Sequence, residues 1–245
     1  MAKVVGPKRG MIMAAGLGQR MRPLTNDCPK PLIEVAGRTL LDHAIDRLKH
    51  AGVRMIVVNV HYKGEMVIDH LKKRTDVEIR IQDERQKLLD TGGALRKALP
   101  HFDGEPFYTH NSDSIWLESW GENLQRMAER WDDKEMDCLM LLAATHSSIG
   151  YEGRGDFTMD ADGHLAWRQP QRIAPFAWPG IQIMHPRLVK RGPDAEVFST
   201  SKLWDIAAEE GRLCGIRLDG KWMHIGTPDA KAEAEAFLGL REAAL

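Results

Sequence analysis

The sequence is poor in cysteine, in unbalanced charge and in long apolar runs, and each shortage excludes a class of protein. Its 245 residues include three cysteines, Cys28, Cys138 and Cys214, which form no CxxC pair. This number and spacing favour free thiols in a reducing cytoplasm over disulfides or structural zinc. The 34 basic and 35 acidic residues leave a net charge of −1. Bulk charge therefore indicates neither a nucleic-acid groove nor a charged membrane surface.

Long apolar segments are also lacking. No stretch approaches the roughly 20 apolar residues of a membrane span. The N-terminal segment MAKVVGPKRGMIMAAG places positive charge before an apolar run, but glycines and arginines interrupt that run after about six residues, which is short for a signal peptide. We interpret the run as a first strand, and we expect a cytoplasmic protein without a membrane partner. The length and the 43% hydrophobic content suffice for one large α/β domain.

The most informative segment that is present runs from Arg9 to Leu32. Glycines allow positive φ and let backbone N–H groups approach phosphate oxygens closely. Arginine adds a planar fork of donors, and flanking prolines restrict the backbone around the point charge of a lysine. This combination predicts a polyphosphate site. In chain order, the segment contains a short apolar run, Gly16-Leu17-Gly18, Arg20, Arg22 and Pro29-Lys30-Pro31.

Two other glycine-rich motifs fit this segment poorly. A dinucleotide fingerprint, G-x-G-x-x-G, needs a third glycine where the chain has Met21, and Pro23 follows two residues later. No run in the chain matches a P-loop. A plain glycine turn with solvated arginines stays open on the local pattern alone.

Alternating strand and helix patterns follow the glycine-rich loop. A helix is expected after Thr39, which stands at capping-box spacing from Asp42. Strands are expected at 54–60 and 77–82, with a helix at 65–73 between them. Right-handed crossovers in such a β-α-β-α-β opening place the glycine-rich loop at the carboxyl edge of the sheet, where open α/β proteins bind ligands. Further strands are expected at 106–111, 137–144, 181–185 and 212–218, helices at 118–131 and 199–209, and a hairpin at 156–168.

Asp113 is a candidate metal ligand because it follows the strand expected at 106–111. A carboxylate in this place suits Mg²⁺, which prefers hard oxygen ligands supplemented by water and phosphate. The alternative is that Asp113 is the N-cap of the helix expected at 118–131. A second candidate ligand contact is Thr91-Gly92-Gly93, where paired glycines enter a helix.

Together these segments resemble the signature of the sugar-1-phosphate nucleotidyltransferases. Within that family, the short length and the run from Leu88 to Gly93 most resemble uridylyltransferases that act on N-acetylmuramic acid 1-phosphate. Mannose-1-phosphate guanylyltransferases come next. The resemblance rests on residues 16–25 and 29–32, on Thr91-Gly92-Gly93, on Asn111-Ser112-Asp113 and on residues 222–227.

The resemblance implies a fold and a reaction. The fold is a Rossmann-like α/β/α sandwich with a mixed, mainly parallel central sheet, in a single domain over 1–245. About 1–150 would form the nucleotide-binding half and about 151–245 the sugar-binding half. The reaction transfers a nucleotidyl group from an NTP, UTP in the first instance or GTP in the alternative, to a sugar 1-phosphate and releases pyrophosphate. The partners are these two substrates, and the protein is expected to be a monomer or a small homo-oligomer.

The resemblance also implies roles for individual residues. Arg20, Lys30 and Asp113 form the catalytic set, with Arg20 on the β- and γ-phosphates and Lys30 between the α-phosphate and the sugar phosphate. Asn111 either contacts the ribose or sugar or serves the fold alone. The remaining nucleotide contacts are Ala15, Gly16 and Gly18 along the nucleotide, and Glu84, Thr91 and Gly92 at the base.

His224 departs from the family pattern, which usually has a second metal-binding aspartate there. Imidazole is a poorer partner than a carboxylate for Mg²⁺. The metal set of Asp113 and His224 therefore leaves several alternatives: Mg²⁺ held by Asp113, phosphates and water alone, a His224 that donates to phosphate, a site that prefers Mn²⁺, or a histidine satisfied by backbone. The same departure keeps open a regulatory subunit that binds nucleotide without turnover. Guanylylation of a molybdopterin-type cofactor is a further enzymatic alternative.

Overall fold

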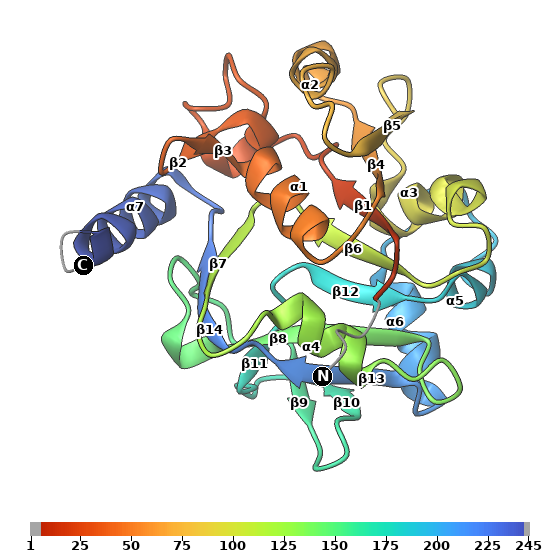
Figure 1. Ribbon diagram of the computed structural model, residues 1–245. Coiled ribbons are helices and arrows are strands. Elements are labelled where there is room, and N and C mark those ends of the chain that lie inside the picture. The colour runs from red at the N-terminus through yellow and green to blue at the C-terminus, as the bar shows by residue number, and fades with distance from the viewer. Residues whose placement is uncertain (1–5, 243–245) are drawn as a thin grey trace.

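The computed structural model describes residues 6–242, which form a ten-stranded mixed sheet with helices on both faces (Figure 1). Strands β1, β4, β5 and β6 run parallel, and β12 joins β6 to β8 in antiparallel fashion. Across the sheet the strands are β10 (Leu165–Trp167), β9 (Phe157–Met159), β11 (Phe176–Ala177), β8 (Cys138–Ala144), β12 (Ile181–Met184), β6 (Phe107–Asn111), β1 (Arg9–Met13), β4 (Met55–Val60) and β5 (Glu78–Asp83), with β13 (Leu213–Arg217) beside β8.

Two helix layers cover the two faces of this sheet. Because side chains alternate along a strand, neighbouring residues of β1 enter different cores: Ile12 packs with α1 (Leu40–His50), α2 (Gly64–Leu71) and α4 (Asn123–Arg130). Met11 packs with α3 (Asp90–Ala98), α5 (Pro186–Lys190) and α6 (Ser201–Glu209), which lie together at one side of Figure 1. The expected α/β/α sandwich with a mixed sheet is therefore confirmed.

The parallel opening of the chain places the glycine-rich loop as expected. Strand β1 lies between β4 and β6 and is parallel to both. The loop after Met13 thus leaves the carboxyl edge of the sheet between two neighbouring strand ends. This is the position where open α/β sheets bind ligands.

A separate two-stranded ribbon follows Asp113 at the carboxyl edge of the main sheet. Strand β7 (Ser114–Glu118) pairs antiparallel with β14 (Gly220–His224), and α7 (Pro228–Glu242) packs beside them in a third apolar cluster. The helix expected at 118–131 begins only at Asn123, because Glu118 is the last residue of β7 and the chain bends over residues 119–121. Asp113 therefore precedes a strand, and its interpretation as a helix N-cap is wrong.

Short elements complete the described chain, and none of its helices combines the length and apolar character needed to cross a membrane. The three cysteines are free thiols. The short elements are the 3-10 turns η1 (Gln19–Met21), η2 (Lys30–Leu32), η3 (Leu99–His101) and η4 (Thr145–Ser147), and the strands β2 (Glu34–Val35) and β3 (Arg38–Thr39).

Candidate active site

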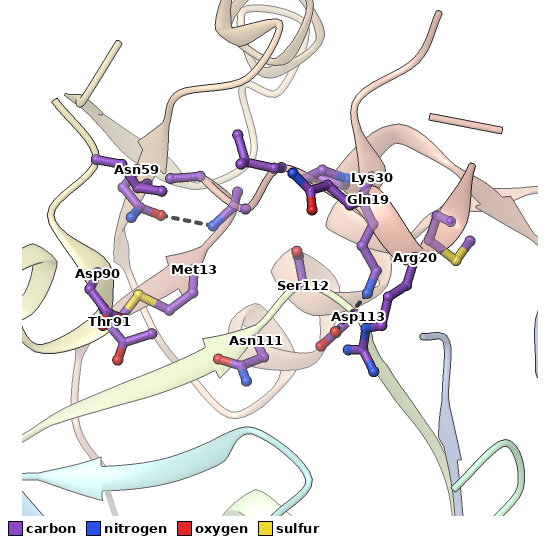
Figure 2. Close-up of a pocket in the computed structure, with 18 of the residues that line it drawn as sticks. Met13, Gln19, Arg20, Lys30, Asn59, Asp90, Thr91, Asn111, Ser112 and Asp113 are labelled. Carbon is purple, nitrogen blue, oxygen red and sulfur yellow. Dashed lines mark hydrogen bonds and ion pairs between the residues drawn. The ribbon is translucent and has the colours of Figure 1, made fainter. Parts of the chain in front are cut away.

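The carboxyl ends of β1 and β6 open into a hollow of about 660 Å³ (Figure 2). Figure 2 shows Arg20, Lys30 and Asp113 converging at one end of it, while Asn59, Asp90 and Thr91 lie at the other. The hollow therefore has a charged end and a mostly uncharged end joined by the glycine-rich loop. Of the residues assigned from the sequence, those that line it are Ala15, Gly16, Gly18, Arg20, Lys30, Thr91, Asn111 and Asp113.

The glycine-rich loop forms one wall, and its two glycines serve different needs. Gly18 has φ of 63°, which an L side chain rarely adopts, and its carbonyl accepts a hydrogen bond of 2.8 Å from Thr25 Oγ1. A Cβ at Gly16 would meet nothing within 4 Å, so this position leaves open space beside the chain. Within residues 6–242, no acceptor is recorded for the backbone N–H groups of residues 15–18. Unpaired donors along a loop are suited to bind phosphate oxygens.

Lys30 and Asp113 form the central ion pair of the charged end. The Lys30 Nζ lies 2.7 Å from Asp113 Oδ2, and only 13% and 22% of the two side chains is exposed. Burial raises the pKa of the Asp113 carboxyl, but the charge and hydrogen bond of Lys30 outweigh it, so the pKa lies below its usual value. Asp113 is thus ionised at neutral pH. The two residues stand 83 positions apart, and the structure brings them together.

Arg20 adds a second cation at this end. It lies in η1, directly after the glycine-rich loop, and lines the hollow. In the described part of the chain no acceptor is recorded for its guanidinium, which Figure 2 shows beside Asp113 and the Lys30 ammonium. Arg20 is therefore available to an anionic ligand.

His224 ends β14 and lies opposite Ser114, the residue that follows Asp113. Gly226, which lines the hollow, makes room for its imidazole, because a Cβ at position 226 would lie 2.7 Å from His224 Nε2. Burial is the main cause that lowers the pKa of His224, with Lys30 and Arg20 acting in the same direction and Asp113 against them. The imidazole is therefore neutral near pH 7 and has a free lone pair for a cation or a hydrogen bond.

Asn111 is the last residue of β6, at the middle of the hollow in Figure 2. Its N–H donates to the carbonyl of Gly180 at 2.9 Å, and Gly180 must lack a side chain because a Cβ there would be 2.6 Å from the Asn111 Cβ. No partner is recorded among the described residues for the Asn111 amide group. The amide is thus held in place by its backbone and left open to a ligand.

Glu84, which was expected at the base, lies outside this lining. It is 2% exposed, and its carboxylate accepts hydrogen bonds from Asn59 Nδ2 at 3.0 Å, Gln82 Nε2 at 2.7 Å and the Leu89 N–H at 3.3 Å. Asn59 Oδ1 in turn accepts from the Ala14 N–H at 2.8 Å. Glu84 and Asn59 therefore tie the loop after β1 to the loop before α3. Residues of both loops line the hollow, and we call these loops the two walls of its uncharged end.

Gly92, also expected at the base, lies outside the lining as well. Its N–H donates to the Phe198 carbonyl at 2.8 Å, and a Cβ at position 92 would lie 2.8 Å from that same oxygen. Thr91 does line the hollow, and its Oγ1 accepts from the Thr200 N–H at 2.9 Å. The glycine thus serves the close approach of α3 to residues 196–200.

Sequence reasoning assigned no role to several lining residues, among them Asn59, Asp90 and Val197. Asn59 carried a visible signal, since it is the polar residue in the otherwise apolar strand MIVVNV. Asp90 adopts a φ of 58° at the start of α3, which nothing in its sequence neighbourhood indicates. Val197 reaches the hollow only because α3 docks on its segment.

Comparison with known proteins gives three findings. The family model for nucleotidyl transferases matches residues 9–151. The chain is 44% identical to N-acetylmuramate alpha-1-phosphate uridylyltransferase of Caulobacter vibrioides, over 95% of this chain and 97% of that protein. It is 29% identical to the Neisseria meningitidis protein of the same name, over 94% of this chain and 98% of that one.

A solved structure supports the fold. The crystal structure of HddC from Yersinia pseudotuberculosis complexed with GMP-PN matches with a TM-score of 0.76 and 22% identity, over 94% of this chain and 99% of that one. At that identity the likeness concerns the fold alone. The family model covers more than half of the chain, and the Caulobacter relative matches almost all of it. The resemblance inferred from the sequence motifs is thus confirmed, and the chain belongs to the nucleotidyl transferase family.

Proposed function

We propose that this protein transfers uridylyl from UTP to N-acetylmuramate 1-phosphate and releases pyrophosphate. The observation that carries the proposal is the Lys30–Asp113 ion pair, 2.7 Å apart at the charged end of the hollow. The glycine-rich loop, whose N–H groups have no recorded acceptor within residues 6–242, forms one wall of the same hollow. The relative at 44% identity over nearly the full length of both chains supports the choice of substrates. The product would be a nucleotide sugar, a precursor of cell-wall polymers, made in the cytoplasm where NTPs are available.

The reaction needs no general base. A phosphate monoester is already anionic near pH 7, so one of its oxygens attacks the α-phosphorus of UTP directly. The new phosphorus–oxygen bond forms as the bond to the α–β bridging oxygen breaks, and pyrophosphate leaves with that electron pair. The protein must hold two anions in line and stabilise the charge that develops. Lys30 would contact the phosphates that react, and Arg20 the leaving pyrophosphate.

A divalent cation fits the charged end. Asp113 offers an ionised carboxylate and His224 a neutral imidazole at the neighbouring strand end. Carboxylate and phosphate oxygens suit Mg²⁺, and the imidazole nitrogen makes Mn²⁺ an equally suitable ion. When bound, the cation would neutralise charge on the phosphates. Lys30 would then exchange the carboxylate of Asp113 for a phosphate.

The first test is a substrate panel. The purified protein is incubated with UTP, GTP, ATP or CTP and a set of sugar 1-phosphates, with Mg²⁺ or Mn²⁺, and pyrophosphate release is measured. We expect the fastest release with UTP and N-acetylmuramate 1-phosphate. Preference for GTP with mannose 1-phosphate would contradict the proposed substrates, and no release in any combination would contradict an enzymatic role.

The second test removes the ion pair. We expect Lys30→Ala and Asp113→Ala each to lower kcat by about 10²–10³-fold, the range seen when one preorganised charge-stabilising group is lost. Matched controls are Lys72→Ala and Asp69→Ala, which break an exposed ion pair of 2.8 Å on the surface. The controls should leave kcat unchanged. If the melting temperatures of the site variants fall far enough to explain their lost activity, the pair is structural instead.

The third test concerns the buried Glu84 network as a positioning element. In Glu84→Gln an amide NH₂ replaces an oxygen that faces donors, so the two walls of the uncharged end lose their alignment. We expect KM for UTP to rise about tenfold, as for one hydrogen bond to a charged group, with a smaller change in kcat and a lower UTP-to-GTP preference. Asp83→Asn, at the exposed neighbouring residue, is the control. An equal rise in KM for UTP and for the sugar phosphate would contradict a role specific to the base.

A further inference from the structure

A second hollow, of about 1030 Å³, lies at the far end of the β7–β14 ribbon from the active site. The ribbon pairs Ser114 with His224 at the catalytic end and Glu118 with Gly220 at the other. Trp120 stands beside this second hollow with 97% of its surface exposed. We call the following residues the Trp120 patch: Trp120, Arg126, Arg217, Asp219, Lys221 and Phe237.

The backbone that carries Trp120 is firmly held. The Trp120 N–H donates to Asp219 Oδ2 at 3.1 Å. Asn123, which is fully buried, donates from Nδ2 to the Asp219 carbonyl and accepts from the Asp219 N–H, both at 2.8 Å. A Cβ at Gly220 would collide with the Leu117 carbonyl, so the chain also passes closely there. The indole is thus presented to solvent by a braced turn, and little backbone order would be lost on covering it.

The hollow itself is lined by cations. Arg126 donates to Asn123 Oδ1 at 2.9 Å and to the Arg217 carbonyl at 3.1 Å, and Lys221 donates to the Ser147 carbonyl at 2.9 Å. No carboxylate partner is recorded for either cation within residues 6–242. No acceptor is recorded among residues 6–242 for the Arg217 guanidinium. Glu118 is already neutralised, since it accepts from Arg47 at 2.6 Å. The hollow therefore favours an aromatic face, through cation–π contact, together with an anion.

Trp120 and Asp219 supply that combination on the same patch. The exposed indole of Trp120 lies beside the hollow, and the Asp219 carboxylate accepts the hydrogen bond of the Trp120 N–H. A surface that carries both a projection and a matching hollow is self-complementary about a two-fold axis, as isologous dimer interfaces are. We propose that a second copy of this chain docks here, with the Trp120 of each subunit in the hollow of the other and each Asp219 near the partner's Arg217.

The proposed interface leaves both active sites open, because the Trp120 patch and the charged end of the catalytic hollow lie at opposite ends of the ribbon. The Trp120 indole also makes no recorded contact within the described chain. Replacing it should therefore change the assembly and leave the fold and the turnover of each subunit intact.

The experiment is sedimentation velocity on the full chain over a range of micromolar concentrations. We expect a species of twice the 27.6 kDa chain mass. Trp120→Ala should raise the dimer Kd by about 30-fold or more, as for a tryptophan hot spot, with an unchanged melting temperature and kcat. Arg217→Glu should weaken the dimer as well.

The matched control is Ile173→Ala, which shortens another apolar side chain, 78% exposed, on the loop between β10 and β11. This variant should dimerise like the wild type. A wild-type protein that stays monomeric at every concentration overturns the proposal. So does a Trp120→Ala protein that dimerises as strongly as the wild type, or an Ile173→Ala protein that dissociates to the same extent as Trp120→Ala.

Discussion

The ion pair between Lys30 and Asp113 is the interaction on which the site depends. A solvated pair of this kind contributes little, but these side chains are largely covered, and Lys30 keeps the Asp113 carboxyl charged where burial alone would favour its neutral form. The folded protein thus holds both kinds of charge that a metal–triphosphate complex requires. The Asp113 carboxylate is available to the metal ion, and the Lys30 ammonium is available to the phosphates. When the substrate binds, Lys30 and Asp113 must therefore exchange each other for the phosphate and the metal ion. No new charge has to form on the protein in this poorly hydrated place.

Several elements converge to hold this pair. Pro29 and Pro31 flank Lys30 at η2. Asp113 lies between the carboxyl end of β6 and the start of β7, which forms the ribbon with β14. The Ile225 N–H donates to the Asp113 carbonyl at 3.0 Å, which fastens the strand end to the residue after His224. The same ribbon carries the Trp120 patch at its other end. Catalytic and proposed assembly surfaces therefore share one rigid piece of structure without overlapping.

Much of this arrangement follows from local sequence. The first strands, the glycine-rich loop and the strand ending at Asn111 follow from residue patterns, and topology rules then place Gly18 and Asp113 at one edge of the sheet. The β7–β14 pairing does not follow, because its partners are 108 positions apart at the Trp222–Ser114 hydrogen bond. Glycines pose the same difficulty. Gly16 leaves open space in the hollow, whereas Gly92 makes room for a neighbouring segment of the protein. The sequence around each glycine does not indicate whether a ligand or another part of the chain will occupy the space.

The exchange of partners by Lys30 is the claim most directly open to measurement. A crystal structure with Mg²⁺ or Mn²⁺ and a non-hydrolysable UTP analogue would show it. We expect the Lys30 Nζ to leave Asp113 Oδ2 for an oxygen of the nucleotide phosphates, and the Asp113 carboxylate to contact the metal ion. A nucleotide bound in the hollow with the Lys30–Asp113 contact still at its present 2.7 Å, and the metal held elsewhere, would contradict it.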